Sequence, residues 1–87
     1  MTITTDQVLG IVRDAVVTVM EVEPGTVTRE SRLVEDLRCD SLALVEIAEI
    51  VEERIGGGFR IEDAALDDIA TVGEAVDYAV ARLGDNA

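Results

Sequence analysis

The sequence of 87 residues contains no histidine, no lysine and no tryptophan, and it has a single cysteine. Without histidine, the chain lacks the commonest general base and the commonest zinc ligand. A single cysteine forms neither an internal disulfide nor a cysteine-based metal site, and without lysine no Schiff base can form. We therefore expect a protein that is not an enzyme and that holds no metal ion.

Aromatic residues are also scarce, at 2% of the chain, although 48% of the residues are hydrophobic. This hydrophobic share is too large for an acidic disordered tail. A core of valine, isoleucine, leucine and alanine is typical of helices whose aliphatic stripes interlock. The length allows one small domain, so we expect residues 1–87 to form a single domain.

Positively charged residues are also scarce. The chain has 19 acidic residues and only seven arginines, so its formal net charge is −12. Such a chain is repelled by nucleic-acid phosphates and by anionic membranes, so its expected partners are basic protein surfaces. No apolar run approaches the roughly 18 residues that span a bilayer. The N-terminal residues lack the basic and apolar regions of a signal peptide, which leads us to expect a cytoplasmic protein.

Helical periodicity of the apolar residues predicts an all-α fold, a small four-helix bundle with three longer helices and one short third helix. The predicted helices cover residues 5–20, 41–55, 62–69 and 72–84. Thr4 with Gln7, and Thr71 with Glu74, have the spacing of capping boxes at two helix starts. Between the first two helices, residues 21–40 form a loop longer than most connections, which more often indicates function than slack.

The tripeptide Asp40-Ser41-Leu42 lies where this loop becomes the second helix. Asp40 is a suitable N-cap, because its carboxylate can accept from backbone N–H groups of the first turn. Ser41 would then expose its hydroxyl at the positive end of the helix dipole, a place that favours a phosphate. On these residues alone, an ordinary capping pair is the simpler interpretation.

The second helix also has an unusual outer face, opposite its core-facing stripe. This face carries two apolar and four acidic residues: Leu42, Val45, Glu46, Glu49, Glu52 and Glu53. It is either a solvated acidic surface with two exposed hydrophobic residues or a docking face for a partner with apolar pockets and basic groups. The net charge is −8 from residue 41 onward and −4 before it, which favours docking by electrostatic steering.

Other candidate sites have simpler interpretations. We interpret Cys39 as a partly buried small hydrophobic residue, because the chain has no histidine to activate a thiol. The triplet Gly56-Gly57-Gly58 is not a phosphate loop, since no Lys-Ser/Thr follows it, and it is expected to end the second helix and form a flexible joint. The acidic residues between 62 and 68 lack the spacing of a calcium loop. Phe59 is expected to anchor the joint to the core.

The run Leu33-Val34-Glu35-Asp36-Leu37-Arg38-Cys39-Asp40-Ser41-Leu42 resembles the signature of acyl carrier proteins. The likeness continues through the second helix and over residues 69–78. It implies an acyl-carrier fold in which Ser41 bears a covalent 4′-phosphopantetheine arm and Asp40 caps the helix beside it. Three features depart from the family. Arg38 and Cys39 stand where glycine and small or apolar residues are frequent, Glu49 stands where methionine is common, and the Gly56–Gly58 triplet lengthens a connection.

The resemblance implies a shuttle with no chemistry of its own. A phosphopantetheinyl transferase, using Mg²⁺, would join the arm to the Ser41 hydroxyl from coenzyme A. The arm's thiol would carry acyl groups as thioesters between an acyltransferase, a ketosynthase or other acyl-processing enzymes with basic docking surfaces. We expect the carrier itself to be a monomer.

The cargo is indicated only by local resemblance. Arg38-Cys39-Asp40-Ser41 lacks the Gly-Gly usual in carriers of aminoacyl or peptidyl groups, and Asp-Ser-Leu-Ala-Leu at 40–44 resembles stand-alone carriers of polyketide synthases. The absence of lysine and the abundance of arginine, valine and alanine suggest a GC-rich bacterial genome. Polyketide or other secondary-metabolite biosynthesis is therefore favoured. The alternatives are a primary fatty-acid carrier and an unmodified acidic helical adaptor.

Overall fold

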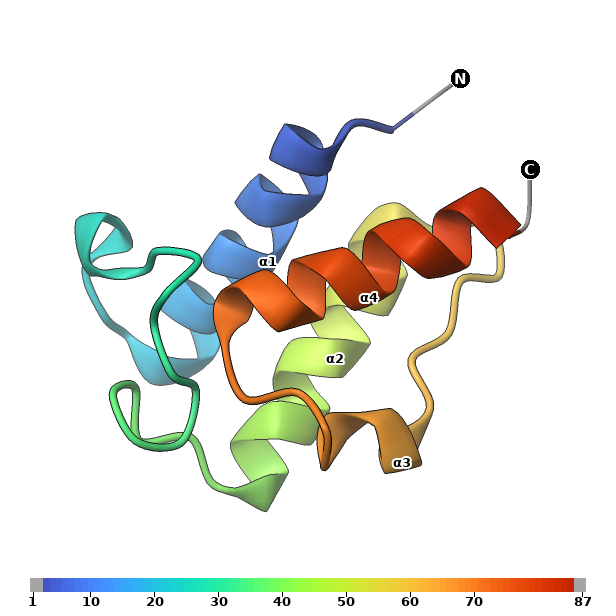
Figure 1. Cartoon of the computed structure of the whole chain (residues 1–87). Helices are drawn as coiled ribbons and strands as arrows, with labels where there is room; N and C mark the ends of the chain where they lie inside the picture. Colours follow the sequence, from blue (N-terminus) through green and yellow to red (C-terminus); the bar gives the residue numbers. More distant parts are fainter. Residues whose placement is uncertain (1–2, 86–87) are drawn as a thin grey trace.

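The computed structural model describes residues 3–85, and over that range it confirms an all-α bundle of four α-helices (Figure 1). The helices are α1 (Thr5–Met20), α2 (Ser41–Ile55), α3 (Asp63–Leu66) and α4 (Val72–Asp85), and the short 3₁₀ helix η1 spans Pro24–Thr26. The bounds of α1 and α2 are those predicted, whereas α4 ends at Asp85 rather than at residue 84. Within the described range, extended pairing is limited to one isolated bridge between Arg32 and Thr71.

Both predicted capping boxes form. The hydroxyl of Thr4 accepts from the backbone N–H of Gln7 at 3.1 Å, and the Gln7 side chain accepts from the backbone N–H of Thr4 at 2.8 Å. At the start of α4, the hydroxyl of Thr71 accepts from the N–H of Glu74 at 3.1 Å, and the Glu74 carboxylate accepts from the N–H of Thr71 at 3.0 Å. These reciprocal bonds satisfy N–H groups that a helix end leaves unpaired, and so they fix where α1 and α4 begin.

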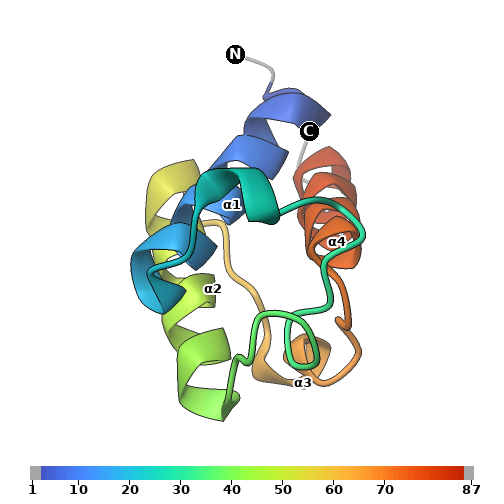
Figure 2. The same cartoon turned by 90° about the vertical axis from the view of Figure 1, so that its left-hand side faces the viewer.

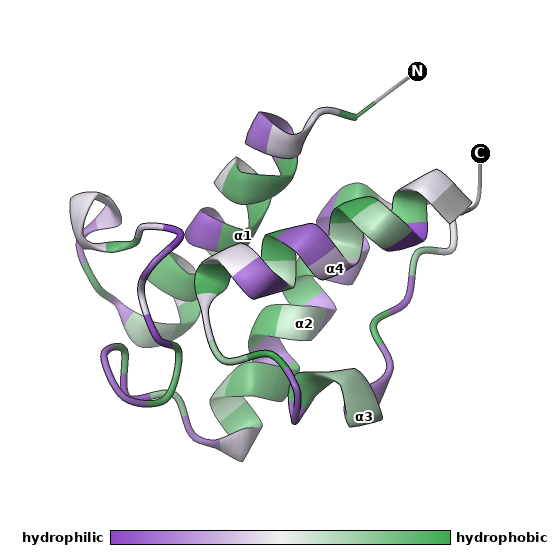
Figure 3. Ribbon diagram, viewed as in Figure 1, coloured by the Kyte–Doolittle hydropathy of each residue, from purple (hydrophilic) through white to green (hydrophobic). Residues whose placement is uncertain are grey.

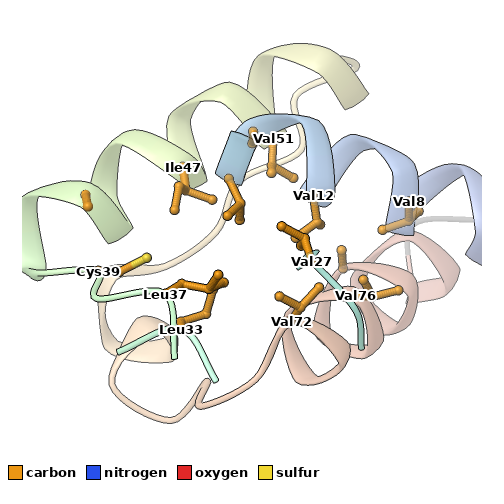
Figure 4. Close-up of a cluster of buried hydrophobic side chains, with 14 of the residues drawn as sticks. Val8, Val12, Val27, Leu33, Leu37, Cys39, Ile47, Val51, Val72 and Val76 are labelled. Atoms are coloured by element: carbon orange, nitrogen blue, oxygen red, sulfur yellow. The ribbon is translucent and has the colours of Figure 1, made fainter. Parts of the chain in front are cut away.

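The core lies where α1 packs against both α2 and α4, and the loop between α1 and α2 covers it. Figure 4 shows the side chains of these elements pointing toward one another. The labelled members come from all four segments: Val8, Val12, Val27, Leu33, Leu37, Cys39, Ile47, Val51, Val72 and Val76. The core is aliphatic, and its one aromatic member is the buried Phe59, which anchors the segment after α2 as predicted.

The prediction for the third helix was too long. A helix over 62–69 was expected, but α3 covers only Asp63–Leu66. Glu62 provides no side-chain cap, and none of the helical residues is buried, so neither capping nor packing extends the helix. Two aspartates follow, and aspartate is a weak helix former. The N–H of Asp68 bonds to the carbonyl of Ala65, closing a tighter turn.

The glycine triplet ends α2 by a conformation that other residues avoid. Gly56, Gly57 and Gly58 all have positive φ, at 72°, 63° and 83°. Gly56 combines its φ with a ψ of −162°, a region that is almost exclusive to glycine. The predicted end of α2 at this triplet is therefore confirmed, and the triplet makes a sharp change of direction between α2 and the segment that leads to α3.

The long loop from residue 21 to residue 40 is tied to the start of α4. The N–H of Leu33 donates to the carbonyl of Ala70 at 2.9 Å, and the N–H of Val72 donates to the carbonyl of Ser31 at 3.0 Å. The N–H of Gly73 donates to the carbonyl of Arg29 at 2.9 Å. Figure 2 shows this loop running from the end of α1 past the start of α4 to the start of α2. The start of α2 is thus placed by packing and hydrogen bonds.

The start of α2 lies at the opposite end of the bundle from the start of α1 and the end of α4, as Figures 1 and 2 agree. Hydrophobic and hydrophilic residues alternate along the helices (Figure 3), so each long helix has a polar side. Among residues 3–85, no helix has both the length and the apolar character that crossing a membrane requires.

Candidate functional site

The site begins at Asp40, the residue that caps α2. Its backbone is extended, with φ −93° and ψ −178°. One carboxylate oxygen, Oδ1, accepts from the N–H of Ala43 at 2.8 Å, and the Asp40 carbonyl accepts from the N–H of Leu44 at 3.0 Å. Asp40 is therefore the predicted N-cap, and Ser41 is the first residue of the helix. The Ser41 side chain is exposed.

The residues before the cap alternate between the core and the solvent. Leu37 and Cys39 are buried, with exposed fractions of 7% and 2%, whereas Arg38 and Asp40 are exposed. The N–H of Cys39 donates to the carbonyl of Leu33 at 2.9 Å. Burial raises the pKa of the Cys39 thiol, and the nearby charge of Asp40 raises it further. Cys39 is thus the small hydrophobic residue that was predicted, but it is fully rather than partly buried, and it holds the loop against the core two positions before Ser41.

Arg38 has a backbone conformation that is rare for its type. Its φ is 62°, in the left-handed region where a Cβ atom is crowded by the following carbonyl. Glycine avoids this crowding, which gives a physical reason for the frequency of glycine at this place in the family that the sequence resembles. The turn itself is retained here with arginine, so the path of the chain into Asp40 and Ser41 does not require glycine.

The start of α2 suits a phosphate-bearing group. Within residues 3–85, the backbone N–H groups of Ser41 and Leu42 form no hydrogen bond, whereas those of Ala43 and Leu44 are both taken by Asp40. Two free donors therefore lie beside an exposed hydroxyl at the positive end of a helix of 15 residues. The residues present fit an esterified phosphate on Ser41, because such an anion can accept from these donors.

The predicted outer face of α2 is present, with one correction. Leu42 and Val45 are exposed, at 66% and 36%. Three glutamates beside them, Glu46, Glu49 and Glu53, are exposed and belong to no ion pair among the side chains that the structure describes. This face combines apolar side chains with unpaired carboxylates, which is the arrangement that a basic partner with apolar pockets would fit.

The prediction that Glu52 lies exposed on this face was wrong. Its side chain is only 17% exposed and lies near the Nε of Arg60, at 4.0 Å. One carboxylate oxygen accepts from the backbone N–H of Ile61 at 2.6 Å. The cause is the sharp turn at the glycine triplet, which brings the segment before α3 back along α2. Glu52 therefore holds that segment against α2 instead of facing a partner.

A groove opens beside Ser41, between the loop, α2 and α3. It measures about 340 Å³ and is lined in part by Val34, Glu35, Ser41, Leu44 and Asp67. Val34 is 55% exposed, and the sequence reasoning did not single it out as an exposed apolar residue. The sequence did contain an indication of this exposure. Leu33 and Leu37 are four residues apart and both are buried, and Val34 does not share their spacing.

Deeper between the helices lies a small cavity of about 30 Å³. Its walls are almost wholly apolar and come from α2, α3, α4 and the segments between them, including Leu44, Val51, Ile61, Leu66 and Tyr78. A space of that size holds at most one or two water molecules. In this conformation the cavity is therefore too small for an acyl chain. No group of metal-ligating side chains is found among the described residues.

Comparisons with known proteins identify the family. Residues 10–79 match the family described as "Phosphopantetheine attachment site". An acyl carrier protein of Thermotoga maritima is 33% identical over 79 residues, which cover 91% of this chain and 95% of that protein. A meromycolate extension acyl carrier protein of Mycobacterium leprae is 35% identical, over 90% of this chain and 66% of that protein.

A solved structure supports the same assignment. The acyl carrier protein of Enterococcus faecalis superposes with a TM-score of 0.73 at 31% sequence identity, covering 92% of this chain and 99% of that chain. Both the sequence match and the fold therefore cover most of the molecule. The chain belongs to the acyl carrier protein family, and it is a phosphopantetheine-bearing carrier that has no catalytic activity of its own.

Proposed function

We propose that Ser41 is the residue to which phosphopantetheine is attached. The observation that carries this proposal is the position of its exposed hydroxyl at the first residue of α2, beside two backbone N–H groups that are unpaired within the described chain. The other serine, Ser31, is buried, and its hydroxyl donates to the carbonyl of Thr26 at 3.1 Å. A transferase can therefore reach Ser41 without unfolding the loop.

The chain's own residues have three tasks in this function. Asp40 orders the first turn of α2, so that the Ser41 hydroxyl is presented on a rigid element. That hydroxyl is the nucleophile that the transferase uses on coenzyme A. When bound, the arm supplies a terminal thiol that holds an acyl group as a thioester. The protein then provides the surface by which enzymes recognise the cargo, and the tether raises the local concentration of that cargo.

Membership in the family implies interaction with a phosphopantetheinyl transferase and with acyl-processing enzymes. We propose that these enzymes dock on Leu42, Val45, Glu46, Glu49 and Glu53. The two exposed apolar side chains would enter pockets, and the unpaired glutamates would meet arginine or lysine. Such a small interface with a polar rim allows rapid exchange between partners. We further propose a monomeric carrier in the cytoplasm.

For the cargo we propose intermediates of polyketide or other secondary-metabolite biosynthesis, on the basis of the sequence around Ser41. The relatives include a protein named for meromycolate extension, and primary fatty-acid synthesis is the alternative. The two can be separated by loading the chain with a malonyl group. A polyketide-type ketosynthase should then accept it faster than a fatty-acid-type ketosynthase. The reverse order would overturn the cargo proposal and leave the carrier function intact.

The attachment proposal is tested by intact mass after incubation with coenzyme A and a broad-specificity transferase. The wild type and a Ser31→Ala variant should both gain one phosphopantetheine, whereas Ser41→Ala should gain none. Circular dichroism must show that both variants are folded. A gain that persists in Ser41→Ala would contradict the assigned site, and no gain in any variant would favour the unmodified adaptor.

The docking face is tested by reversing one of its charges. Glu46→Arg should slow loading and acyl transfer at low salt, and the difference should shrink at high salt because exposed charges are then screened. Glu23→Arg is the matched control, since Glu23 is also exposed but lies on the loop before η1. Val45→Glu should slow transfer as well. Equal slowing by the control would show that net charge matters and that the face does not.

A further inference from the structure

Arg38 is an exposed cation that forms no ion pair with the side chains that the structure describes. Five of the seven arginines lie within 4.0 Å of a carboxylate: Arg29, Arg32, Arg54, Arg60 and Arg82. Arg38 and Arg13 are outside these ion pairs among the side chains that the structure describes. In a chain with 19 acidic residues, a free arginine three positions before Ser41 requires an explanation.

Arg38 is exposed and lies close to Ser41 along the chain, and Ser41 is exposed as well. Cys39 is buried between Arg38 and Asp40, which are both exposed. Consecutive Cα atoms are 3.80 Å apart, so the Cα atoms of Arg38 and Ser41 are separated by at most about 11 Å. A long arginine side chain and a phosphate esterified to Ser41 can meet across that span. Arg38 has a positive φ, at which its Cβ atom is crowded by the following carbonyl. A glycine at this position would avoid that crowding.

The other cation near Ser41 is already occupied. Arg32 lines the same groove as Ser41, but its guanidinium is bound by Glu35 and Asp36. A phosphodiester on Ser41 would add a negative charge next to Asp40 and in the half of the chain with a net charge of −8. Near Ser41 in the chain, Arg38 can offset this charge without giving up any ion pair that the structure describes.

We propose that the guanidinium of Arg38 pairs with the phosphodiester that joins the arm to Ser41, and so fixes the direction in which the arm leaves the surface. Arginine presents two parallel N–H donors to a phosphate, which gives this pair a defined geometry. Arg38 is then a positioning residue for the arm. The inference rests on the proposed attachment of the arm to Ser41.

The test is a thermodynamic cycle between the arm and the arginine. Urea unfolding is measured for the apo and loaded forms of the wild type and of Arg38→Gln at low salt. Loading should stabilise the wild type more than the variant, by about 2- to 5-fold in the unfolding equilibrium constant, as for an exposed ion pair. The difference should decrease at high salt. Arg38→Lys should keep part of the coupling, because it keeps the charge and loses the paired donors.

Arg13→Gln is the matched control, because it removes the same charge from the other arginine outside the ion pairs, and its cycle should show no coupling. A second readout is the NMR signal of the Arg38 side-chain Nε–H. It should shift on loading by more than the signal of any other arginine, which a purely structural role would not produce.

Two kinds of failure can be told apart. If mass spectrometry shows a loaded chain but the cycle has no coupling, the role of Arg38 is wrong and the carrier function stands. If, in addition, Arg38→Gln slows transfer to a partner enzyme, the arginine contacts that enzyme and the arm proposal is likewise overturned. If the chain cannot be loaded on Ser41, both proposals fall together.

Discussion

Two glycines in helices should respond to alanine in opposite directions. Gly73 is the second residue of α4 and is buried. A Cβ atom there would lie 3.0 Å from the carbonyl oxygen of Arg29 and 3.3 Å from its Cβ. Gly10 lies in the interior of α1, and a Cβ atom added to it would meet nothing within 4 Å. The two substitutions share their chemistry and differ chiefly in the space available for the added Cβ atom.

The balance between helix propensity and packing decides whether alanine raises or lowers the free energy of unfolding at each position. In a helix interior, alanine is favoured over glycine by about 0.8–1.0 kcal/mol, so Gly10→Ala should raise the free energy of unfolding by about that amount. At Gly73 the gain is opposed by overpacking, which costs about 1–3 kcal/mol, and the backbone carbonyl of Arg29 cannot rotate away. We expect a net loss of about 1 kcal/mol for Gly73→Ala.

Thermal unfolding followed by circular dichroism measures both effects. For a domain of this size, 1 kcal/mol corresponds to about 4–8 °C in Tm. Gly10→Ala should raise the Tm by about that amount, and Gly73→Ala should lower it by a similar amount. Gly73→Ala should also slow loading of Ser41, since the contact with Arg29 holds the long loop. A rise in Tm for both variants would refute the packing argument at the start of α4.

Substitutions at three further residues test the segment before α2. Asp40→Ala should lower the free energy of unfolding by about 1 kcal/mol, whereas Asp40→Asn should keep most of it because asparagine also caps helices; urea unfolding measures both. Arg38→Gly should stabilise the apo protein by up to about 1 kcal/mol, because the left-handed conformation costs a residue with a Cβ atom more than glycine loses in entropy; equal or lower stability in urea would contradict this. The raised pKa of Cys39 means that the unfolded chain loses its thiol proton first. Stability should therefore fall as the pH rises above the ordinary cysteine pKa of about 8.5, and unfolding measured against pH should show a smaller fall for Cys39→Ala.

The parts of the fold that could be predicted are those specified by local chemistry. The bounds of α1 and α2 follow from Thr4 and Asp40, whose side chains cap the helices, and from the residues that end the apolar repeats. The length of α3 could not be predicted, because it depends on whether its residues find a core to pack against, and none of them is buried. The bridge between Arg32 and Thr71 joins distant segments and leaves no periodic signal.

In the site, too, the features set by local chemistry could be predicted, and those set by tertiary contacts could not. Asp40 and the exposed outer face of α2 could be read from cap chemistry and helical periodicity. Glu52 was misplaced because its surroundings are set by a tertiary turn that returns Ile61 to its carboxylate. The positive φ of Arg38 was hidden for a different reason, since arginine gives no local indication of a left-handed backbone. Its lack of an ion pair within the described residues also depends on where the carboxylates of other segments lie.

The most direct measurement of the carrier function uses the arginine positions of the chain. Trypsin can cut only after arginine here, and cleavage after Arg38 and Arg54 releases a peptide of residues 39–54 in which Ser41 is the only hydroxyl-bearing residue. After treatment with a transferase and coenzyme A, this peptide should carry the phosphopantetheine mass, and the added group should remain after reduction of any disulfide at Cys39. An unmodified peptide, or the added mass on any other peptide, would contradict the account.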